Sequence, residues 1–490
     1  MSTSKTIRPR KILLGGLLLL PLLLISPLWA LEPSQPAFSQ RLPIPPLLTG
    51  TRRGGETVYE LTAQTGSRTF FQDTDTLTYG YNGDYLGPTL LLRRGEDVRI
   101  RVRNTIEEST TVHWHGMELP GVMDGGPHQV IQAGAIWEPH FTVDQPAATL
   151  WYHPHPIGNT ARQVYLGLAG LIIIDDDTAE SLKLPKQYGS NDIPLVIQDR
   201  RFQTNGSFLY RLAMPDLMQG LIGDTYLVNG AIKPYLSAGR ELIRFRLLNG
   251  SNSSIYRFSF SGKSAFSQIA SDGGFLEHPV EMSTLTLSPG ERGEILLDLR
   301  RRESGDSLYL FTETFQGPRD EVLKIVVADR ESGSHTSATQ IPGKLVSIAE
   351  IPQSQSLRSR HFDLETMGRG GMGMIGGRLT INGRKMDMKR IDATVKAGST
   401  EIWEIVNVRT GMMEIPHSFH LHGVQFQILD INGKKPPAGE SGWKDTVLVW
   451  PGDTVRIIIP FREFPGIYMY HCHLLEHEDD GMMGQFEVVP

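Results

Sequence analysis

Alternating apolar and polar residues recur in three similar stretches of the chain. Each stretch begins with an Asn-Gly pair, continues to a glycine, and then alternates at a period of two as far as an asparagine. The strands expected from this pattern span residues 95–104, 239–249 and 398–407. Period-two alternation is typical of half-buried β-strands, and Asn-Gly is a strong signal for a tight turn. The repetition predicts three similar β-rich domains that arose by duplication.

Short strands between turn residues dominate the rest of the sequence, and few windows have the period of a long amphipathic helix. This pattern predicts an all-β protein built from three Greek-key β-sandwich or barrel domains. A length of 490 residues agrees with about three domains. The expected segments are a Pro-rich lead-in at 31–48, domains at 49–178, 179–335 and 358–490, and a linker at 336–357.

The first thirty residues form a separate segment, 1–30. Residues 1–11 are basic, residues 12–25 are apolar, and the segment ends at the small residue Ala30. This order is typical of a secretory signal peptide, so we expect a periplasmic or secreted protein. An uncleaved membrane anchor is the less favoured alternative, because a membrane span needs about 20 apolar residues. We expect no stable membrane span after cleavage.

Composition and charge narrow the class of protein further. The chain has 39% hydrophobic and 21% charged residues, as in ordinary globular proteins, and its net charge of −6 disfavours nucleic acid as a partner. We expect a monomer. Cys472 is the only cysteine, so no disulfide within the chain is available. Outside the cytoplasm an exposed thiol would be oxidised, and the sequence therefore predicts that Cys472 is either buried and inert or a metal ligand.

Histidines are concentrated where the first and third repeats align. Ten of the 15 histidines lie in four clusters: His113, His115, His153, His155, His417, His420, His422, His471, His473 and His477. Residues i and i+2 of a strand point to one face about 6.6 Å apart, so each His-x-His pair presents two imidazoles to one side. The corresponding stretch after Gly290 in the second repeat has no histidine. The outer domains are predicted to hold a metal site, with the middle domain as a spacer.

The tripeptide His471-Cys472-His473 joins two predicted metal sites, because its histidines face one side of a strand and its cysteine the other. On the cysteine side, the blue-copper combination of two imidazoles, a thiolate and a thioether is available from His417, Cys472, His477 and Met482. Zinc is the competing metal, but structural zinc sites favour cysteine-rich sets and catalytic zinc sites seldom use methionine. A cysteine nucleophile with a histidine base is another alternative, and it leaves the paired histidines without a function.

These residues resemble the multicopper oxidases, most of all the bacterial periplasmic copper efflux (cuprous) oxidases, with bilirubin oxidases and bacterial laccases as relatives. The resemblance covers nearly all of the chain after residue 30. Its landmarks are His113-Trp-His-Gly116, Asp124-Gly-Gly-Pro127, Val143-Asp-Gln-Pro-Ala-Ala148, Gly442-Trp-Lys-Asp-Thr446 and the segment from His471 to Met482.

The resemblance implies three cupredoxin-like domains and four copper ions: one type 1, one type 2 and two type 3. It places the type 1 copper on His417, Cys472, His477 and Met482, and the type 2 copper on His113 and His420. It places one type 3 copper on His115, His153 and His473, and the other on His155, His422 and His471.

The implied reaction is the one-electron oxidation of a reductant at the type 1 copper, coupled to the four-electron reduction of dioxygen to water at the other three. Electrons would pass from Cys472 to His471 and His473. Asp124 and Glu478 are the candidates for proton delivery, and the alternative is that these carboxylates only orient ligands.

The reductant expected from the resemblance is Cu(I), with a role in copper tolerance. Thioethers suit Cu(I), and the candidates for a substrate-copper site are Met367, Met372, Met374 and Met413. The family's methionine-rich insertion is otherwise missing, and Ile415 stands near one of the positions of that site. A methionine-poor approach favours phenols or aromatic amines, so laccase-like oxidation is the alternative.

Two other classes of protein remain as hypotheses. One is a non-catalytic copper-binding scaffold, although none of the twelve expected ligands is missing from the sequence. The other is a copper nitrite reductase, which has no need of four histidine pairs.

Overall fold

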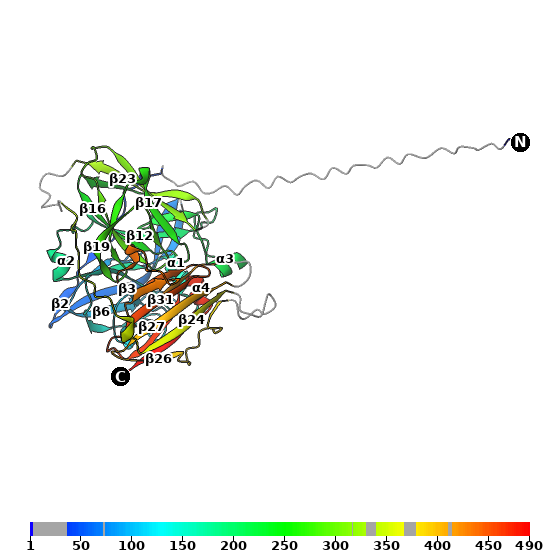
Figure 1. Cartoon of the computed structure of the whole chain (residues 1–490). Helices are drawn as coiled ribbons and strands as arrows, with labels where there is room; N and C mark the ends of the chain where they lie inside the picture. The colour runs from blue at the N-terminus through cyan, green and yellow to red at the C-terminus, as the bar shows by residue number, and fades with distance from the viewer. Residues whose placement is uncertain (3–36, 72–73, 316, 330–339, 367–378, 410–413) are drawn as a thin grey trace.

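The computed structural model describes residues 1–2, 37–71, 74–315, 317–329, 340–366, 379–409 and 414–490. Strands dominate this part of the chain, and the predicted all-β class is confirmed (Figure 1). Its six sheets follow one another in pairs along the chain. Apart from residues 1–2, the expected signal peptide lies outside the described residues, as do Met367, Met372, Met374 and Met413.

The first pair combines a five-stranded and a six-stranded sheet. The five-stranded sheet has the order β1-β5-β11-β10-β7, with bounds Leu47–Leu48, Thr89–Arg93, Gly170–Asp175, Ala148–His153 and His113–His115. The other contains β2 (Thr51–Arg53), β3 (Glu56–Phe71), β6 (Asp97–Asn104) and β8 (Ile136–Trp137), with β4 (Thr74–Tyr81) paired to β3 and β9 (His140–Thr142) paired to β6.

The second pair combines a seven-stranded and a five-stranded sheet. The larger contains, in order, β14 (Ala231–Ile232), β13 (Thr225–Val228), β12 (Asp192–Arg200), β16 (Leu242–Asn249), β21 (Arg292–Asp298), β18 (Phe266–Ser271) and β19 (Gly274–Met282). The smaller contains β15 (Tyr235–Gly239), β23 (Arg319–Ala328), β22 (Ser307–Thr314), β17 (Tyr256–Phe260) and β20 (Leu285–Leu287).

The third pair consists of two five-stranded sheets. One contains β25 (Leu379–Ile381), β24 (Arg358–Thr366), β27 (Thr400–Val408), β31 (Thr454–Pro460) and β29 (Gln427–Ile431). The other contains β26 (Ala393–Lys396), β33 (Met483–Val489), β32 (Gly466–Cys472), β28 (His417–Leu421) and β30 (Thr446–Val449). Strands β24, β27 and β31 lie side by side in Figure 1.

The helices of the described residues are short. They are α1 (Thr160–Leu166), α2 (Asp177–Ser181), α3 (Met214–Gln219) and α4 (Leu475–Asp479), with 3₁₀ turns η1 (Gly121–Met123), η2 (Ser261–Lys263), η3 (Gln353–Gln355) and η4 (Ala438–Glu440). Helices α1 and α3 both contact α4, and Figure 1 shows the three close together. None of the helices described is long and apolar enough to cross a bilayer.

The three strands expected from the repeated pattern correspond to β6, β16 and β27. Each pairs in parallel with one long strand of its own sheet, namely β3, β12 or β24. The turns that precede them have asparagine at φ 54° (Asn82), 50° (Asn229) and 53° (Asn382), a left-handed conformation that asparagine tolerates better than most residues. Each of these side chains hydrogen-bonds an N–H and a C=O of that long strand. The repeated Asn-Gly pair thus fixes the turn to the sheet.

A different asparagine, the one that ends each repeated strand, also has a structural function. The side-chain amides of Asn104, Asn249 and Asn407 each donate to one backbone carbonyl of the loop that follows and to one carbonyl further along the chain. Because a buried backbone carbonyl without a partner is costly, one amide closes each loop. The sequence signature therefore records the same local construction three times.

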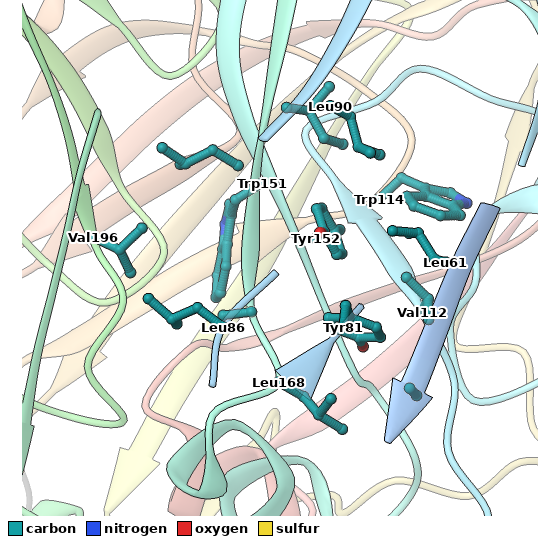
Figure 2. Packing of buried hydrophobic residues seen from close by; sticks show 14 of the residues in the cluster. Leu61, Tyr81, Leu86, Leu90, Val112, Trp114, Trp151, Tyr152, Leu168 and Val196 are labelled. Atoms are coloured by element: carbon teal, nitrogen blue, oxygen red, sulfur yellow. The ribbon is translucent and has the colours of Figure 1, made fainter. Parts of the chain in front are cut away.

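The buried apolar residues form one large cluster for each pair of sheets. In the first cluster, Trp151, Tyr152 and Trp114 project from β10 and β7 (Figure 2). Val196 of β12 belongs to the same cluster and lies across from Trp151 in Figure 2, so the first and second pairs of sheets share a packed interface.

The Pro-rich lead-in contributes to the sheets. Its last residues, Leu47–Leu48, form β1 and pair in parallel with β5. Earlier in the segment, the N–H groups of Phe38 and Leu42 donate to the carbonyls of Lys233 and Tyr235 at 2.8 and 2.7 Å. The lead-in therefore joins the first and second pairs of sheets.

A histidine side chain on β24 contacts a carboxylate on the neighbouring strand β27. His361 lies opposite Glu404 in the register, and its Nδ1 and Nε2 are 2.8 and 2.9 Å from carboxylate oxygens of Glu404 and Asp363. Partial burial lowers the pKa of His361, but the hydrogen bonds to these carboxylates outweigh that effect and raise the pKa above 6.5.

Replacing His361 by Gln should destabilise the protein at about pH 5.5 more than at about pH 8.5. A folded-state pKa above the unfolded value contributes stability that is fully present below the unfolded pKa and is lost as the pH rises through the folded pKa. The pair is half exposed, so the loss at low pH should be about 0.2–1 kcal/mol. Denaturant titrations at the two pH values measure it, and equal losses at both would contradict the expectation.

Candidate metal centre

The predicted ligands come from two sheets that belong to different pairs. In the first pair, β7 lies beside β10 with His113 opposite His153; in the third, β28 lies beside β32 with His420 opposite His471. All twelve predicted ligands are buried at 0% exposure: His113, His115, His153, His155, His417, His420, His422, His471, Cys472, His473, His477 and Met482. The fold therefore places two ladders of imidazoles against each other.

His155, His422 and His471 converge through their Nε2 atoms. The Nε2 of His471 is 3.2 Å from that of His155 and 3.1 Å from that of His422. The Nδ1 atoms of His422 and His471 lie 2.8 and 3.1 Å from Asp124 Oδ2 and Glu478 Oε2, and that of His155 lies 3.4 Å from Glu478 Oε1. The hydrogen bond to Asp124 holds the proton of His422 on Nδ1, and the Cys472 carbonyl, 3.2 Å from His471 Nδ1, does the same for His471. The Nε2 atoms of His155, His422 and His471 thus face one another and fit a shared cation.

His113 and His420 repeat this arrangement with backbone acceptors. Their Nδ1 atoms donate to the carbonyls of Asp124 and Asp445 at 3.0 and 2.9 Å. Their Nε2 atoms are 3.5 Å apart. Both rings thus present an unprotonated Nε2 to the same point.

His115, His153 and His473 form the remaining group around the cluster. The centroids of their rings are 4.9 to 5.6 Å apart. His153 donates its Nδ1 hydrogen to the carbonyl of Pro154 at 2.8 Å. Among the described residues no hydrogen-bond partner exists for His115 Nδ1, His153 Nε2 or either nitrogen of His473. Buried polar atoms are rarely left unpaired, and one such nitrogen on each of the three rings fits metal ligation.

Cys472 lies on the other side of β32. Its Sγ is 3.4 Å from His417 Nδ1 and 3.6 Å from His477 Nδ1. The opposite nitrogens are held by Thr366 Oγ1 and the carbonyl of Met218, both at 3.0 Å. The structure thus brings the predicted cysteine and its two histidines together through the nitrogens that face the sulfur.

Met482 is packed into the same core as Cys472. Its carbonyl accepts the Cys472 N–H at 3.0 Å. The two residues are therefore adjacent in the fold.

Burial sets the protonation of these donors. It raises the pKa of the Cys472 thiol to about 12 and lowers the pKa of His477 to about 4. Burial likewise lowers the pKa of His155 to about 4 and of His473 to about 3. These three imidazoles are therefore neutral at pH 7, which is their ligating form, and the thiol needs a bound cation to ionise.

The structure adds residues that the pattern of histidines did not indicate. Asp445 Oδ1 accepts a hydrogen bond from His115 Nε2 at 3.0 Å, and Arg292 pairs with the same carboxylate. A Cβ at Gly290 would lie 3.1 Å from atoms of both the His115 and His473 rings. The signal for Asp445 was its place within the landmark at 442–446. Because Gly290 and Arg292 belong to the second pair of sheets or its loops, the interpretation of the middle domain as a spacer was wrong.

The chemistry of the donors is that of a copper protein. A thiolate with two imidazoles is a set that copper favours, and nitrogen-only groups beside it suit copper as well. Groups of three donors within 4.8 Å include His417-Cys472-His477 and His155-His422-His471. The fold and the site together fit an all-β oxidoreductase whose buried histidines and cysteine could hold metal ions.

Comparison with known proteins gives the family. Models of the multicopper oxidase family match residues 62–179, 207–324 and 351–490. The chain belongs to the multicopper oxidases, which are oxidoreductases that use copper, dioxygen and a reducing substrate. The three predicted cupredoxin-like domains are confirmed as the fold class.

Individual relatives carry different names. The chain is 41% identical over 430 residues to "Multicopper oxidase mco" of Staphylococcus haemolyticus, with 88% of each chain covered. It is 35% identical over 472 residues to "Cell division protein FtsP" of Xenorhabdus nematophila, with 93% of each covered.

Solved structures superpose along most of the chain. A laccase from Pediococcus acidilactici has a TM-score of 0.84 at 37% identity and covers 93% of this chain and 95% of its own. A laccase-like multi-copper oxidase CueO from Ochrobactrum sp., described as active towards lignin model compounds and lignosulfonate, has a TM-score of 0.83 at 39% identity, covering 91% and 100%.

Replacing Glu478 by Gln should weaken copper binding about 10–100-fold, because the two rings that face this carboxylate lose a charged acceptor. Copper retained after dialysis against graded chelator measures the effect. Asp480→Asn is the control, since Asp480 pairs with Lys385 at the end of the same helix. Full copper content with a lower kcat would instead assign Glu478 to proton delivery, and no change in either would contradict both roles.

Proposed function

We propose that the protein couples the one-electron oxidation of a reductant at a type 1 copper to the four-electron reduction of dioxygen to water at a trinuclear copper cluster. The observation that carries the proposal is a set of ring nitrogens that face each other or have no hydrogen-bond partner among the described residues. One tripeptide joins this set to a buried cysteine. Copper tolerance is the physiological role that we infer, in the periplasm or outside the cell, for a protein that acts as a monomer.

Twelve side chains would hold four copper ions. His417, Cys472, His477 and Met482 would bind the type 1 ion, and His113 with His420 the type 2 ion. The two type 3 ions would be bound by His115, His153 and His473, and by His155, His422 and His471. Bound copper would supply stepwise electron acceptance at the first position and the reduction of dioxygen at the other three.

The protein would supply a short covalent route between the two metal centres, a site that excludes water, and carboxyl groups that deliver protons. His471 and His473 are the peptide neighbours of Cys472 on β32, so the shortest covalent route between the two centres is a few bonds long. Complete burial of the imidazoles excludes water from the cluster. Asp124 and Glu478 lie 2.8 and 3.1 Å from the Nδ1 atoms of His422 and His471, and in this proposal they deliver protons to the site.

Electrons would enter near α3. The Met218 carbonyl of this helix accepts the His477 Nε2 hydrogen, so the helix covers the outer face of the cysteine site. Beside it lies a shallow pocket lined by Gln219, Ile222, Ser253, Ser254, Ile255, Thr314, Phe315, Glu414, Ile415, Pro416 and Leu474. Pro416 is the neighbour of His417, so a reductant in this pocket would lie close to a type 1 ligand.

Two classes of reductant fit this approach. Cu(I) is the first, supported by the four methionines outside the described residues, Met367, Met372, Met374 and Met413, because the segments that contain them adjoin β24 and the pocket residue Glu414. Phenols and aromatic amines are the second. They are favoured by the apolar and hydroxyl-bearing lining, which contains no methionine among the described residues, and by the named activity of the Ochrobactrum enzyme.

The copper-loaded protein should bind four copper ions per chain and show a blue absorption that bleaches with reductant under nitrogen and returns in air. Cys472→Ser should lose the blue colour and oxidase turnover. His278→Gln is the control, because His278 is an exposed histidine whose Nδ1 lies 2.7 Å from the Gly343 carbonyl and which is none of the expected ligands.

Three outcomes would reject this function. A colourless copper-loaded protein would contradict the type 1 site, and peroxide as the main product would contradict the trinuclear cluster. Copper binding without any oxygen consumption would indicate a non-catalytic scaffold.

The four candidate methionines should affect the steady-state kcat/KM for Cu(I) but not that for a bulky phenol. If Cu(I) is the natural reductant, replacing Met367, Met372, Met374 and Met413 by Leu should lower kcat/KM for Cu(I) at least tenfold and leave that for the phenol unchanged. Met386→Leu with Met388→Leu is the control for loss of thioethers elsewhere. Equal or better phenol turnover, unaffected by the methionines, would assign a laccase-like role.

A further inference from the structure

We propose that Arg292 and Asp445 are a positioning pair through which the second domain selects the nitrogen that His115 offers to copper. The inference rests on the proposed copper cluster. It gives a function to a domain that contributes none of the expected ligands.

His115 is oriented in the opposite way to most rings of the cluster. Its Nε2 lies 3.0 Å from Asp445 Oδ1 and 3.1 Å from Thr446 Oγ1, and its Nδ1 is buried without a partner among the described residues. In contrast, acceptors lie at Nδ1 in the rings of His113, His153, His420, His422 and His471. His115 therefore presents Nδ1 where these rings present Nε2.

The charge state of Asp445 forces this choice. Its Oδ1 and Oδ2 accept from Arg292 Nη1 and Nη2 at 2.8 and 2.6 Å, and Oδ2 also accepts from Gln425 at 2.9 Å. Such a forked pair holds the carboxyl group ionised, and an ionised carboxylate only accepts hydrogen bonds. The neutral His115 ring must then carry its hydrogen on Nε2, which leaves the lone pair on Nδ1.

Arg292 in turn is fixed by all three domains. Besides Asp445 in the third, its guanidinium donates to the carbonyl of Thr149 on β10 of the first at 3.1 Å. It also donates to the carbonyls of Gly290 and Asp272 in the second at 2.9 and 3.0 Å. These five hydrogen bonds use all five donors of a side chain that is 1% exposed. No rotation of Arg292 preserves the set.

The lack of a side chain at Gly290 leaves room for the same ring. Gly290 has φ 89°, and a Cβ there would lie 3.1 Å from His115 Cε1 and from two ring carbons of His473. Gly290 therefore leaves the space that the two rings occupy, and Arg292 sets the tautomer of His115 through Asp445.

The test compares this pair with a second buried Arg-Asp pair of the second domain. Arg246 Nε and Nη2 donate to the two oxygens of Asp192 at 2.8 Å each, and neither residue contacts a predicted ligand in the described structure. Asp445→Asn and Arg292→Lys are the test variants. Asp192→Asn and Arg246→Lys are the matched controls. All are reconstituted with copper as full chains.

We expect Asp445→Asn and Arg292→Lys to bind about one copper fewer, or to bind it about 10–100-fold more weakly. Two coupled Cu(II) ions give no electron paramagnetic resonance signal, so loss of one should expose a new signal from its unpaired neighbour. The blue absorption of the Cys472 site should remain. The controls should keep four copper ions and the wild-type spectrum, whatever their melting temperature.

Asp445→Asn and Arg292→Lys with full copper and no new signal would overturn the positioning role, as would the same loss in the controls. If Asp445→Asn fails to fold, the result for Arg292→Lys alone tests the positioning role. This variant keeps the positive charge but loses the paired hydrogen bonds to the Asp445 carboxylate. A wild-type protein that binds fewer than four copper ions would reject the proposed function itself, and a wild-type protein with four would leave only the positioning role in question.

Discussion

The mutual burial of ten imidazoles is the constraint on which the rest of the structure depends. Each ring is removed from water, which favours its neutral form. A neutral imidazole has one donor and one acceptor nitrogen, and nearly every ring has one nitrogen held by a carbonyl, hydroxyl or carboxylate. The other nitrogens face each other or have no partner in the part of the chain that the structure describes, which is a costly arrangement without a cation. Copper binding and the docking of the first domain on the third are therefore coupled, because neither half of the cluster is complete alone.

Duplication explains how one chain builds such a cluster. The outer repeats use the same construction, a histidine pair on each of two neighbouring strands, and place these ladders face to face. The middle repeat keeps the strands and their asparagines but lacks the histidines. It contributes Gly290, where a Cβ would crowd the rings of His115 and His473, and Arg292, which pairs with the carboxylate of Asp445 beside His115.

The single helical turn α4, in the third domain, contacts both of the other domains beside the proposed metal centre. Glu476 accepts from Leu221 N–H and Ser253 of the second domain at 3.0 and 2.7 Å. Glu478 faces His155 and His471, and Asp479 accepts the N–H groups of Thr160 and Ala161 in the first domain at 2.9 Å each. Because His477 lies in the same turn, the geometry of the cysteine site and that of the domain interfaces are set by the same few residues.

The sequence by itself determined the local features of this protein. Period-two alternation gave the strands, Asn-Gly gave the turns, and the spacing of His-x-His pairs showed that two rings share a face. The residue types limited the metal, since one thiolate beside imidazoles and a thioether favours copper. All of these are properties of a few consecutive residues, and backbone geometry fixes them wherever the segment lies in the fold.

Only the tertiary structure decided which nitrogen each ring presents and which rings meet. His115 and Asp445 are far apart in the sequence, and the fork of Arg292 comes from a third domain between them. No periodicity connects such residues, because their contact depends on how separate sheets pack. The pattern could therefore identify the donors, whereas the direction of each lone pair follows from hydrogen bonds that form only when the three domains come together.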